Sequence, residues 1–401
     1  MQYRIDPKTG SKLSVLGFGC MRFSGSLAGS FGPGRKLDAE NAEGLLKTAI
    51  ENGVNYFDTA YIYAGSEELL GNALAKFGLR KQVYIATKLP LILCRRKEDL
   101  DKFFDRELER LQTDYIDYYL LHMLSDVGEW EKFCGWDIQE WIRRKKESGQ
   151  IRQIGFSFHG PQATFLSLLD VYDWDFVQIQ YNYSDENFQA GVTGLKKAAA
   201  KGMPVMIMEP LLGGKLANAL PKPAVECFHA ANSEITPVAW ALRWLWNQPE
   251  VTVVLSGMNQ MSQLTENLQT AENAVPGILS QKELAVYQEV RKLFQASDRI
   301  PCTGCHYCMP CPHGVNIPSC FTAYNTYGSI SKSQGTMQYA LGTLLSGKPA
   351  YAGLCKKCGK CERHCPQHIP IIQSLEEVSG NMETFRFRMM AFGTKLFVKR
   401  S

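Results

Sequence analysis

Short apolar runs recur from residue 15 to residue 256, and amphipathic stretches such as 39–52, 98–111 and 262–272 separate them. Apolar runs of strand length that alternate with helical patterns predict a parallel sheet with crossover helices. Eight such units in one series favour a closed (β/α)8 TIM barrel, of the α/β class, over an open doubly wound sheet. The predicted strands are 15–19, 54–58, 83–88, 116–122, 151–157, 176–180, 204–209 and 251–256.

Other parts of the chain depart from this alternation. Residues 3–5 and 12–14 flank a Lys-Thr-Gly turn and predict an N-terminal hairpin. Residues 24–36 and 211–233 are rich in turn formers and too long for tight turns, so each is predicted as a loop over the active face or a plain surface loop. The predicted domains are a barrel over 1–296, a small and mainly α-helical domain over 297–380, and a basic tail over 381–401.

Composition then limits the kind of protein. The 401-residue chain has a net charge of +4 and no long basic stretch, which argues against nucleic acid as a partner. The polar start does not resemble a signal peptide, and no run approaches the ~18 apolar residues of a membrane span, so we expect a cytoplasmic protein. Of the 13 cysteines, nine lie between 302 and 365. In a reducing compartment such a group indicates metal binding rather than disulfides.

Polar residues close most of the predicted strands. In a barrel of this kind the carboxyl ends of the strands meet on one face, and that face carries catalysis. A single polar residue at a strand end is ordinary, but a series of them predicts a site. These residues are Asp58, Lys88, His122, Ser157, Gln180 and Ser256.

The segments NYFDTAYIYAGSEELLGNAL, IATKLP and YYLLHM resemble the signature of the aldo-keto reductase superfamily, and the resemblance covers roughly 1–275. It implies a (β/α)8 barrel and an NAD(P)-dependent oxidoreductase. The implied catalytic residues are Asp58, Tyr63, Lys88 and His122.

The chemistry of these four residue types agrees with the resemblance. A phenol is a weak acid, with a pKa of about 10, and a nearby ammonium lowers that pKa by stabilising the phenolate. At about 4 Å and an effective dielectric constant near 20, this attraction is about 4 kcal/mol before desolvation. Tyr63 would therefore give the proton to a carbonyl oxygen, with Lys88 as the cation. Asp58 would hold Lys88, and His122 would bind the substrate oxygen or share the proton.

The same resemblance implies a nicotinamide cofactor. SGMNQMSQLTENL, at 256–268, resembles the adenosine-phosphate site of the superfamily, and Ser157 and Gln180 fall where the carboxamide is bound. Gly257, Met258 and Gln263 stand where basic residues usually bind a 2′-phosphate, so NADPH and NADH both remain candidates. The predicted cofactor-binding residues are Ser157, Gln180, Leu211, Ser256, Gly257, Gln263, Glu266 and Asn267.

Two dense cysteine motifs follow the barrel. CKKCGKCERHCP fits the C-x2-C-x2-C-x3-C-P run of bacterial ferredoxins, in which the fourth cysteine ligates the other cluster. CTGCHYCMPCP is one residue shorter before its last cysteine. We therefore predict two [4Fe–4S] clusters in a ferredoxin-like domain, with zinc as the alternative. The predicted ligand sets are Cys302, Cys305, Cys308 and Cys365 for one cluster, and Cys311, Cys355, Cys358 and Cys361 for the other.

The two halves together predict NAD(P)H-linked interconversion of a small carbonyl and an alcohol. Cluster electron transfer would be coupled to this reaction or would accompany it. A redox partner protein such as a ferredoxin is expected. The alternative is an electron-transfer or redox-sensing module that uses the barrel as a docking scaffold, and a third reading makes the clusters purely structural.

Overall fold

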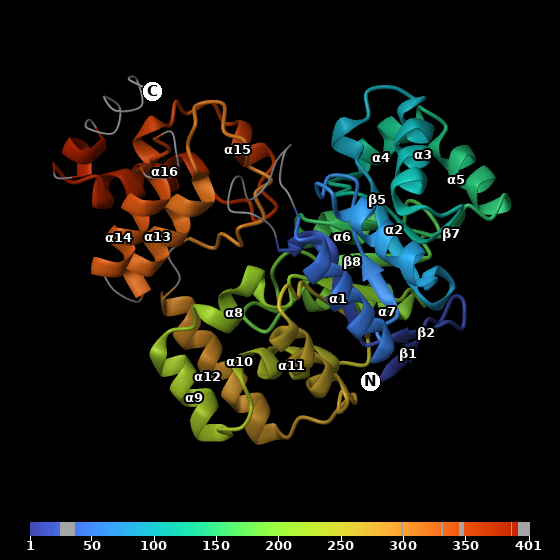
Figure 1. Cartoon of the computed structure of the whole chain (residues 1–401), viewed down its shortest axis with the longest axis horizontal. Coiled ribbons are helices and arrows are strands. Elements are labelled where there is room, and N and C mark those ends of the chain that lie inside the picture. Colours follow the sequence, from blue (N-terminus) through green and yellow to red (C-terminus); the bar gives the residue numbers. More distant parts are fainter. Residues whose placement is uncertain (25–36, 298–299, 330–331, 345–348, 386, 392–401) are drawn as a thin grey trace. The chain divides into compact units, whose positions relative to one another are not determined.

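The structure, a computed structural model, divides into two compact units (Figure 1). The first contains residues 1–211 and 233–285, and the second contains 212–232 and 286–401. The sequence predicted a boundary between 296 and 297. In the structure the second unit begins at 286 and also includes 212–232. The structure describes residues 1–24, 37–297, 300–329, 332–344, 349–385 and 387–391. All of the predicted loop 24–36 except Ser24, and the tail from 392 onward, lie outside these ranges.

Eight parallel strands close into a barrel in the order β10-β3-β4-β5-β6-β7-β8-β9, which confirms the predicted fold class. The predicted N-terminal hairpin is also present, as the antiparallel pair β1 (Tyr3–Ile5) and β2 (Lys12–Ser14). The barrel strands are β3 (Leu16–Gly19), β4 (Tyr56–Asp58), β5 (Tyr84–Leu89), β6 (Ile116–Leu121), β7 (Ile151–Phe158), β8 (Phe176–Gln180), β9 (Val205–Met208) and β10 (Val251–Ser256).

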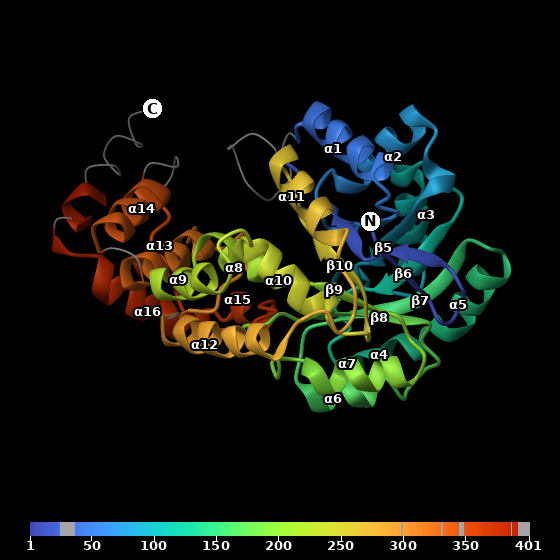
Figure 2. The same ribbon diagram turned by 90° about the horizontal axis from the view of Figure 1, so that it is seen from below.

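Helices surround these strands within the first unit (Figure 2). Local signals set their ends: Asp38 caps the first helix by accepting from the Asn41 N–H, and Gly78 ends the second with a φ of 67°. The helices are α1 (Ala39–Glu51), α2 (Ser66–Phe77), α3 (Asp99–Leu111), α4 (Val127–Cys134), α5 (Ile138–Glu147), α6 (Gln162–Leu168), α7 (Gly191–Ala200), α10 (Pro237–Trp246) and α11 (Met261–Ala271). Short 3-10 turns are η1 (Cys20–Arg22), η2 (Arg80–Gln82) and η3 (Leu91–Leu93).

The barrel interior is apolar toward one end of the strands. Leu13 of the hairpin belongs to this core cluster together with Tyr118 of β6, and the Tyr118 hydroxyl donates to Asp6 Oδ2 at 2.7 Å. The hairpin is thereby fastened to the interior of the barrel. The other members of the cluster are Tyr56, Ala86, Leu120, Phe176, Met206, Val253 and Leu255.

The second unit is mainly helical and has its own apolar core, which includes Phe321, Tyr339 and Leu375. It includes the connection that follows β9. In this connection Lys215 Nζ donates to the Ile300 carbonyl at 3.0 Å, and Gly213 lies so close to Thr303 that a Cβ would be 2.1 Å from its carbonyl oxygen. The elements are η4 (Leu212–Gly214), α8 (Lys215–Asn218), α9 (Lys222–Ala231), most of α12 (Gln281–Ser297), α13 (Ile317–Ser329), α14 (Lys332–Leu344), η5 (Ala352–Leu354), α15 (Lys360–Arg363) and α16 (Ile371–Met382).

In the part of the chain that the structure describes, no helix combines the length and the apolar character needed to cross a membrane.

Candidate active site and cysteine centres

A buried ion pair lies at the carboxyl ends of two neighbouring strands. Asp58 is the last residue of β4, and Lys88 is near the end of β5. The Lys88 ammonium donates to Asp58 Oδ1 at 2.8 Å, to Asp58 Oδ2 at 2.7 Å and to the Thr59 carbonyl at 2.7 Å. These bonds use all three donors of the ammonium. Burial raises the pKa of Asp58, and the Lys88 cation opposes that rise.

Tyr63 and His122 lie next to this pair. Lys88 Nζ is 5.2 Å from the centre of the Tyr63 ring, and the rings of Tyr63 and His122 meet edge to face with centres 6.0 Å apart. Burial and the Lys88 cation hold the pKa of His122 well below its ordinary value. The imidazole is therefore neutral near pH 7, and the structure brings all four predicted catalytic residues together.

The loop that carries Tyr63 is fixed at both ends. Its backbone turns back at the Tyr63 N–H, which donates to the Ala60 carbonyl at 2.9 Å. Ser66, the first residue of α2, donates to the Cys20 carbonyl at 3.0 Å and shares a 2.8 Å hydrogen bond with Thr59. These contacts hold the segment between β4 and α2 over the end of the barrel.

The residues predicted to bind the carboxamide of the nicotinamide lie on β7 and β8. Ser157 is buried, and its hydroxyl accepts from the Met123 N–H at 2.9 Å. Gln180 is also buried, and its Oε1 accepts from Gln189 Nε2 at 3.4 Å. Leu211 is the last residue of the first unit before the chain enters the second.

The predicted adenosine site is formed by the end of β10 and by α11. Asn267 Nδ2 donates to Ser256 Oγ at 2.9 Å, while the buried Asn267 Oδ1 has no hydrogen-bond partner in the described structure. Gln263 caps α11 by accepting from the N–H of Gln260 at 3.3 Å, and Glu266 accepts from the Thr236 hydroxyl. Asn267 therefore keeps an unused acceptor, whereas Gln263 and Glu266 bond to other groups of the protein.

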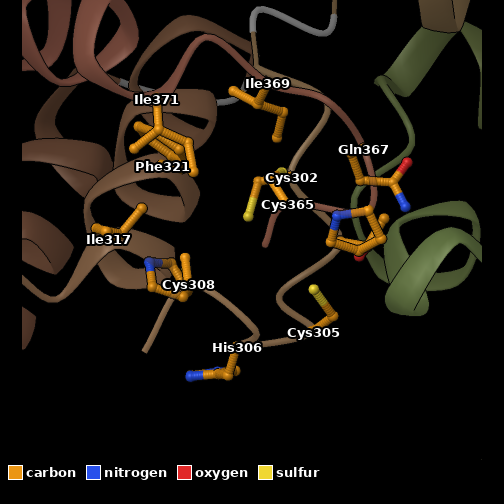
Figure 3. A pocket seen from close by; sticks show the side chains of 13 residues that line it. Cys302, Cys305, His306, Cys308, Ile317, Phe321, Cys365, Gln367, Ile369 and Ile371 are labelled. Atoms are coloured by element: carbon orange, nitrogen blue, oxygen red, sulfur yellow. The ribbon is translucent and has the colours of Figure 1, made fainter. Parts of the chain in front are cut away.

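Cysteines from both motifs surround one hollow in the second unit. Cys302, Cys305, Cys308 and Cys365 line a space of about 310 Å³, part of it open to solvent, with Ile317 and Phe321 among the apolar residues that line the same space (Figure 3). Burial and the neighbouring thiols raise the pKa of Cys308. Burial also raises the pKa of Cys365. The backbone N–H groups of Ile369, Gln367 and His368 bond its sulfur and oppose that rise. Donors of this kind stabilise a thiolate ligand.

The other cysteines are less enclosed. Burial raises the pKa of Cys361 to about 11, and the nearby Cys355 contributes to that rise. Cys358 is exposed, Cys311 is partly buried against the core of the unit, and the Lys357 N–H donates to Cys355 Sγ at 3.4 Å. In the described ranges no group of three or more Cys, His, Asp or Glu side chains could hold a single metal ion.

Comparison with known proteins decides the family. Residues 15–290, more than half of the chain, match the model described as the aldo/keto reductase family. The chain belongs to the aldo/keto reductase family. L-galactose dehydrogenase of Arabidopsis thaliana is 29% identical over 294 residues, which cover 67% of this chain and 87% of that protein. YhdN, an aldo-keto reductase of Bacillus subtilis, is 26% identical over 301 residues, covering 66% and 87%.

Solved aldo-keto reductases have the same barrel. The thermostable aldo-keto reductase Tm1743, solved with the inhibitor epalrestat, is 26% identical with a TM-score of 0.58. That similarity covers 72% of this chain and 100% of Tm1743. Beyond the barrel, residues 301–369 match the model described as a 4Fe-4S dicluster domain. This aldo/keto reductase therefore carries a 4Fe–4S dicluster domain, and the zinc alternative for the cysteines was wrong.

Two residues near the reductase site were missed from the sequence. Gln178 of β8 is buried, donates from Nε2 to Asp58 Oδ2 at 3.2 Å, and has a buried Oε1 that lacks a partner in the described structure. It lies two residues before Gln180 and therefore on the same face of the strand, which was the available signal. Arg22 packs on Gly257, where a Cβ would be 3.4 Å from Arg22 Cδ. Nothing in the local sequence linked these two segments.

Proposed function

We propose that the barrel interconverts a small carbonyl compound and an alcohol with a nicotinamide cofactor. We propose further that the second unit holds two [4Fe–4S] clusters that exchange electrons with this reaction. The observation that carries the proposal is the buried Asp58–Lys88 pair beside Tyr63 at the carboxyl ends of the strands. A bound reduced nicotinamide supplies the hydride.

The residues of the barrel handle the proton. Tyr63 gives its phenolic proton to the substrate oxygen, and the Lys88 cation stabilises the phenolate that remains. With Lys88 Nζ at 5.2 Å from the ring centre, this attraction is about 3 kcal/mol at an effective dielectric constant near 20, before desolvation. The neutral His122 orients the substrate oxygen. Asp58 keeps Lys88 in place and charged.

The free polar atoms of the site fit a nicotinamide dinucleotide. Asn267 Oδ1 is a buried acceptor that an adenine amino group would satisfy, and Gln178 Oε1 is a second one inside the barrel. Arg22, beside Gly257, supplies the positive charge that a phosphate requires. NADPH and NADH both carry a pyrophosphate, so both remain candidates.

The cysteines supply four thiolates for each cluster, in the sets predicted above. A hydride carries two electrons and a cubane cluster passes one, so the oxidation of one further reduced nicotinamide would reduce each of the two clusters by one electron, in two sequential steps, and release one proton. A partner of the ferredoxin type would exchange these electrons with the second unit. The scaffold hypothesis differs from this proposal because it needs no turnover at Tyr63.

Tyr63→Phe tests the proposal. The hydroxyl is the proton donor, so we expect turnover of a panel of aldehydes, ketones and alcohols with NADPH or NADH to fall by about 10²–10⁴-fold. Iron content should not change. Tyr61→Phe is the matched control, because it removes a hydroxyl from the same loop and keeps the ring that packs on Phe103 and Arg110.

Full turnover in Tyr63→Phe would contradict the assigned role of the phenol. A wild-type protein that binds nicotinamide, turns over no member of the panel and still exchanges electrons with a ferredoxin would favour the scaffold hypothesis instead.

A further inference from the structure

The second cysteine motif begins directly after a short 3-10 turn. This turn is η5, Ala352–Leu354, and the Cys355 N–H donates back to the Ala352 carbonyl at 3.0 Å. The conformation at Cys355 therefore depends on what holds the backbone at 352 and 353.

A buried carboxylate from a distant part of the chain holds this turn. Glu383 directly follows α16, and its side chain is shielded, with 7% of the residue exposed. Glu383 Oε1 accepts from the Gly353 N–H at 2.7 Å and from the Tyr339 hydroxyl at 2.9 Å. The same hydroxyl accepts from the Ala352 N–H at 2.9 Å. Two successive N–H groups of the turn thus end on one Glu–Tyr pair.

The Glu383 carboxylate lies very close to the backbone of the turn. Gly353 has no side chain, and a Cβ there would lie 2.5 Å from Glu383 Oε2. Tyr339 on α14 is fully buried, and its ring packs against Phe387 with centres 5.0 Å apart. A buried carboxylate is unfavourable unless it is fully hydrogen-bonded, which explains why Glu383 bonds to both Gly353 and Tyr339. Its replacement by alanine would leave the Gly353 N–H and the Tyr339 hydroxyl without this acceptor.

A second Glu–Tyr pair in the same unit provides a matched comparison. Glu377, on α16, accepts from the Tyr324 hydroxyl of α13 at 2.7 Å. That pair joins two helices, whereas the bonds of Glu383 end on the turn that leads into Cys355.

We propose that Glu383, acting with Tyr339, is a positioning residue for the second cluster and holds Cys355 in the geometry that receives it. This inference rests on the proposed binding of two clusters. The barrel chemistry plays no part in it, so a cluster measurement can test it without a known substrate.

The experiment compares Glu383→Ala, Glu383→Gln and the control Glu377→Ala after anaerobic purification. Iron and sulfide are measured, and electron paramagnetic resonance is recorded on the reduced protein. We expect about eight irons in the wild type, in Glu377→Ala and in Glu383→Gln, whose amide oxygen still accepts both bonds. Glu383→Ala should fall toward about four, with the signal of one cluster retained.

Two double variants assign the lost cluster. Combined with Cys358→Ser, which removes a ligand of the second cluster, Glu383→Ala should cause no further loss. Combined with Cys305→Ser, it should remove most of the remaining iron. Full iron content in Glu383→Ala, or equal loss of both clusters, would overturn the inference. A wild-type protein with about four irons would instead overturn the two-cluster proposal on which it rests.

Discussion

At the scale of single residues, Lys88 is the cation beside the proposed proton donor, Tyr63. Its three donors bond to Asp58 and Thr59, so in the proposed reaction it would act on Tyr63 through its charge alone. The pair is almost completely buried, and its bonds offset the cost of removing both charges from water. Burial and the same Lys88 cation lower the pKa of His122, so its imidazole is neutral near pH 7.

Of the nine cysteines between 302 and 365, eight are the proposed ligands and Cys320 is the ninth. Cys305 lines the hollow with three other cysteines, whereas Cys320 is fully buried in the core of the unit. We predict that Cys305→Ser lowers the iron content from about eight to about four per chain, while Cys320→Ser leaves it near eight. Iron and sulfide analysis checks both values. Equal losses in the two variants would contradict the ligand assignment.

At the scale of elements, a buried carboxylate joins the strand of Lys88 to the loop of Tyr63. Glu67 of α2 accepts from the Thr87 hydroxyl at 2.6 Å, next to Lys88 on β5, and from Arg110 Nη1 of α3 at 3.1 Å. Arg110 in turn donates to the Tyr61 carbonyl at 3.2 Å. The network therefore fixes the distance between two catalytic segments through two helices.

This carboxylate should make stability depend on pH. Burial raises the pKa of Glu67 from 4.5 to about 6, so the folded state binds the proton more tightly than the unfolded state. The resulting stabilisation is complete below about pH 4.5 and is lost as the pH rises through about 6. We therefore expect the unfolding free energy of the wild type, relative to that of Glu67→Gln, to fall by about 2 kcal/mol as the pH rises across that range. Chemical denaturation at several pH values measures it, and a difference that grows with pH would contradict the assignment.

The contact between α2 and α3 depends on a glycine. A Cβ at Gly71 would lie 2.4 Å from the Arg110 carbonyl oxygen, whereas Gly44, exposed on α1, has nothing within 4 Å. Gly71→Ala should destabilise the barrel by about 1–3 kcal/mol through overpacking. Gly44→Ala should stabilise it by about 0.5–1 kcal/mol, because alanine loses less backbone entropy in a helix. Thermal unfolding of the two variants checks the opposite signs.

Elements with a clear period were predictable, and contacts between distant segments were not. The alternation of apolar runs located all eight strands of the barrel, and the polar strand ends located Asp58, Lys88 and His122. Glu383 and Arg22 act across the chain, on Gly353 and Gly257, and no local pattern reports such pairs. For the same reason, 211–233 read only as a loop, although it contains the helices α8 and α9.

At the scale of the whole molecule, the chain passes repeatedly between its two units. It leaves the barrel after Leu211, returns at Ser233 and leaves again after Ala285. The first departure comes three residues after β9, whose carboxyl end belongs to the catalytic face. The excursion is fixed to the second unit by Lys215 and Gly213, next to the first ligand segment. The chain thus runs from the end of β9 directly into a segment that packs beside the first cysteine motif.

The central claim is that one chain combines a nicotinamide-dependent barrel with two clusters that exchange electrons with it. The most direct test is anaerobic iron and sulfide analysis, followed by the visible spectrum before and after addition of NADPH or NADH. The account predicts about eight irons per chain and bleaching of the cluster absorbance by at least one of the two nucleotides. About four irons, or a cluster spectrum that neither nucleotide changes, would contradict it.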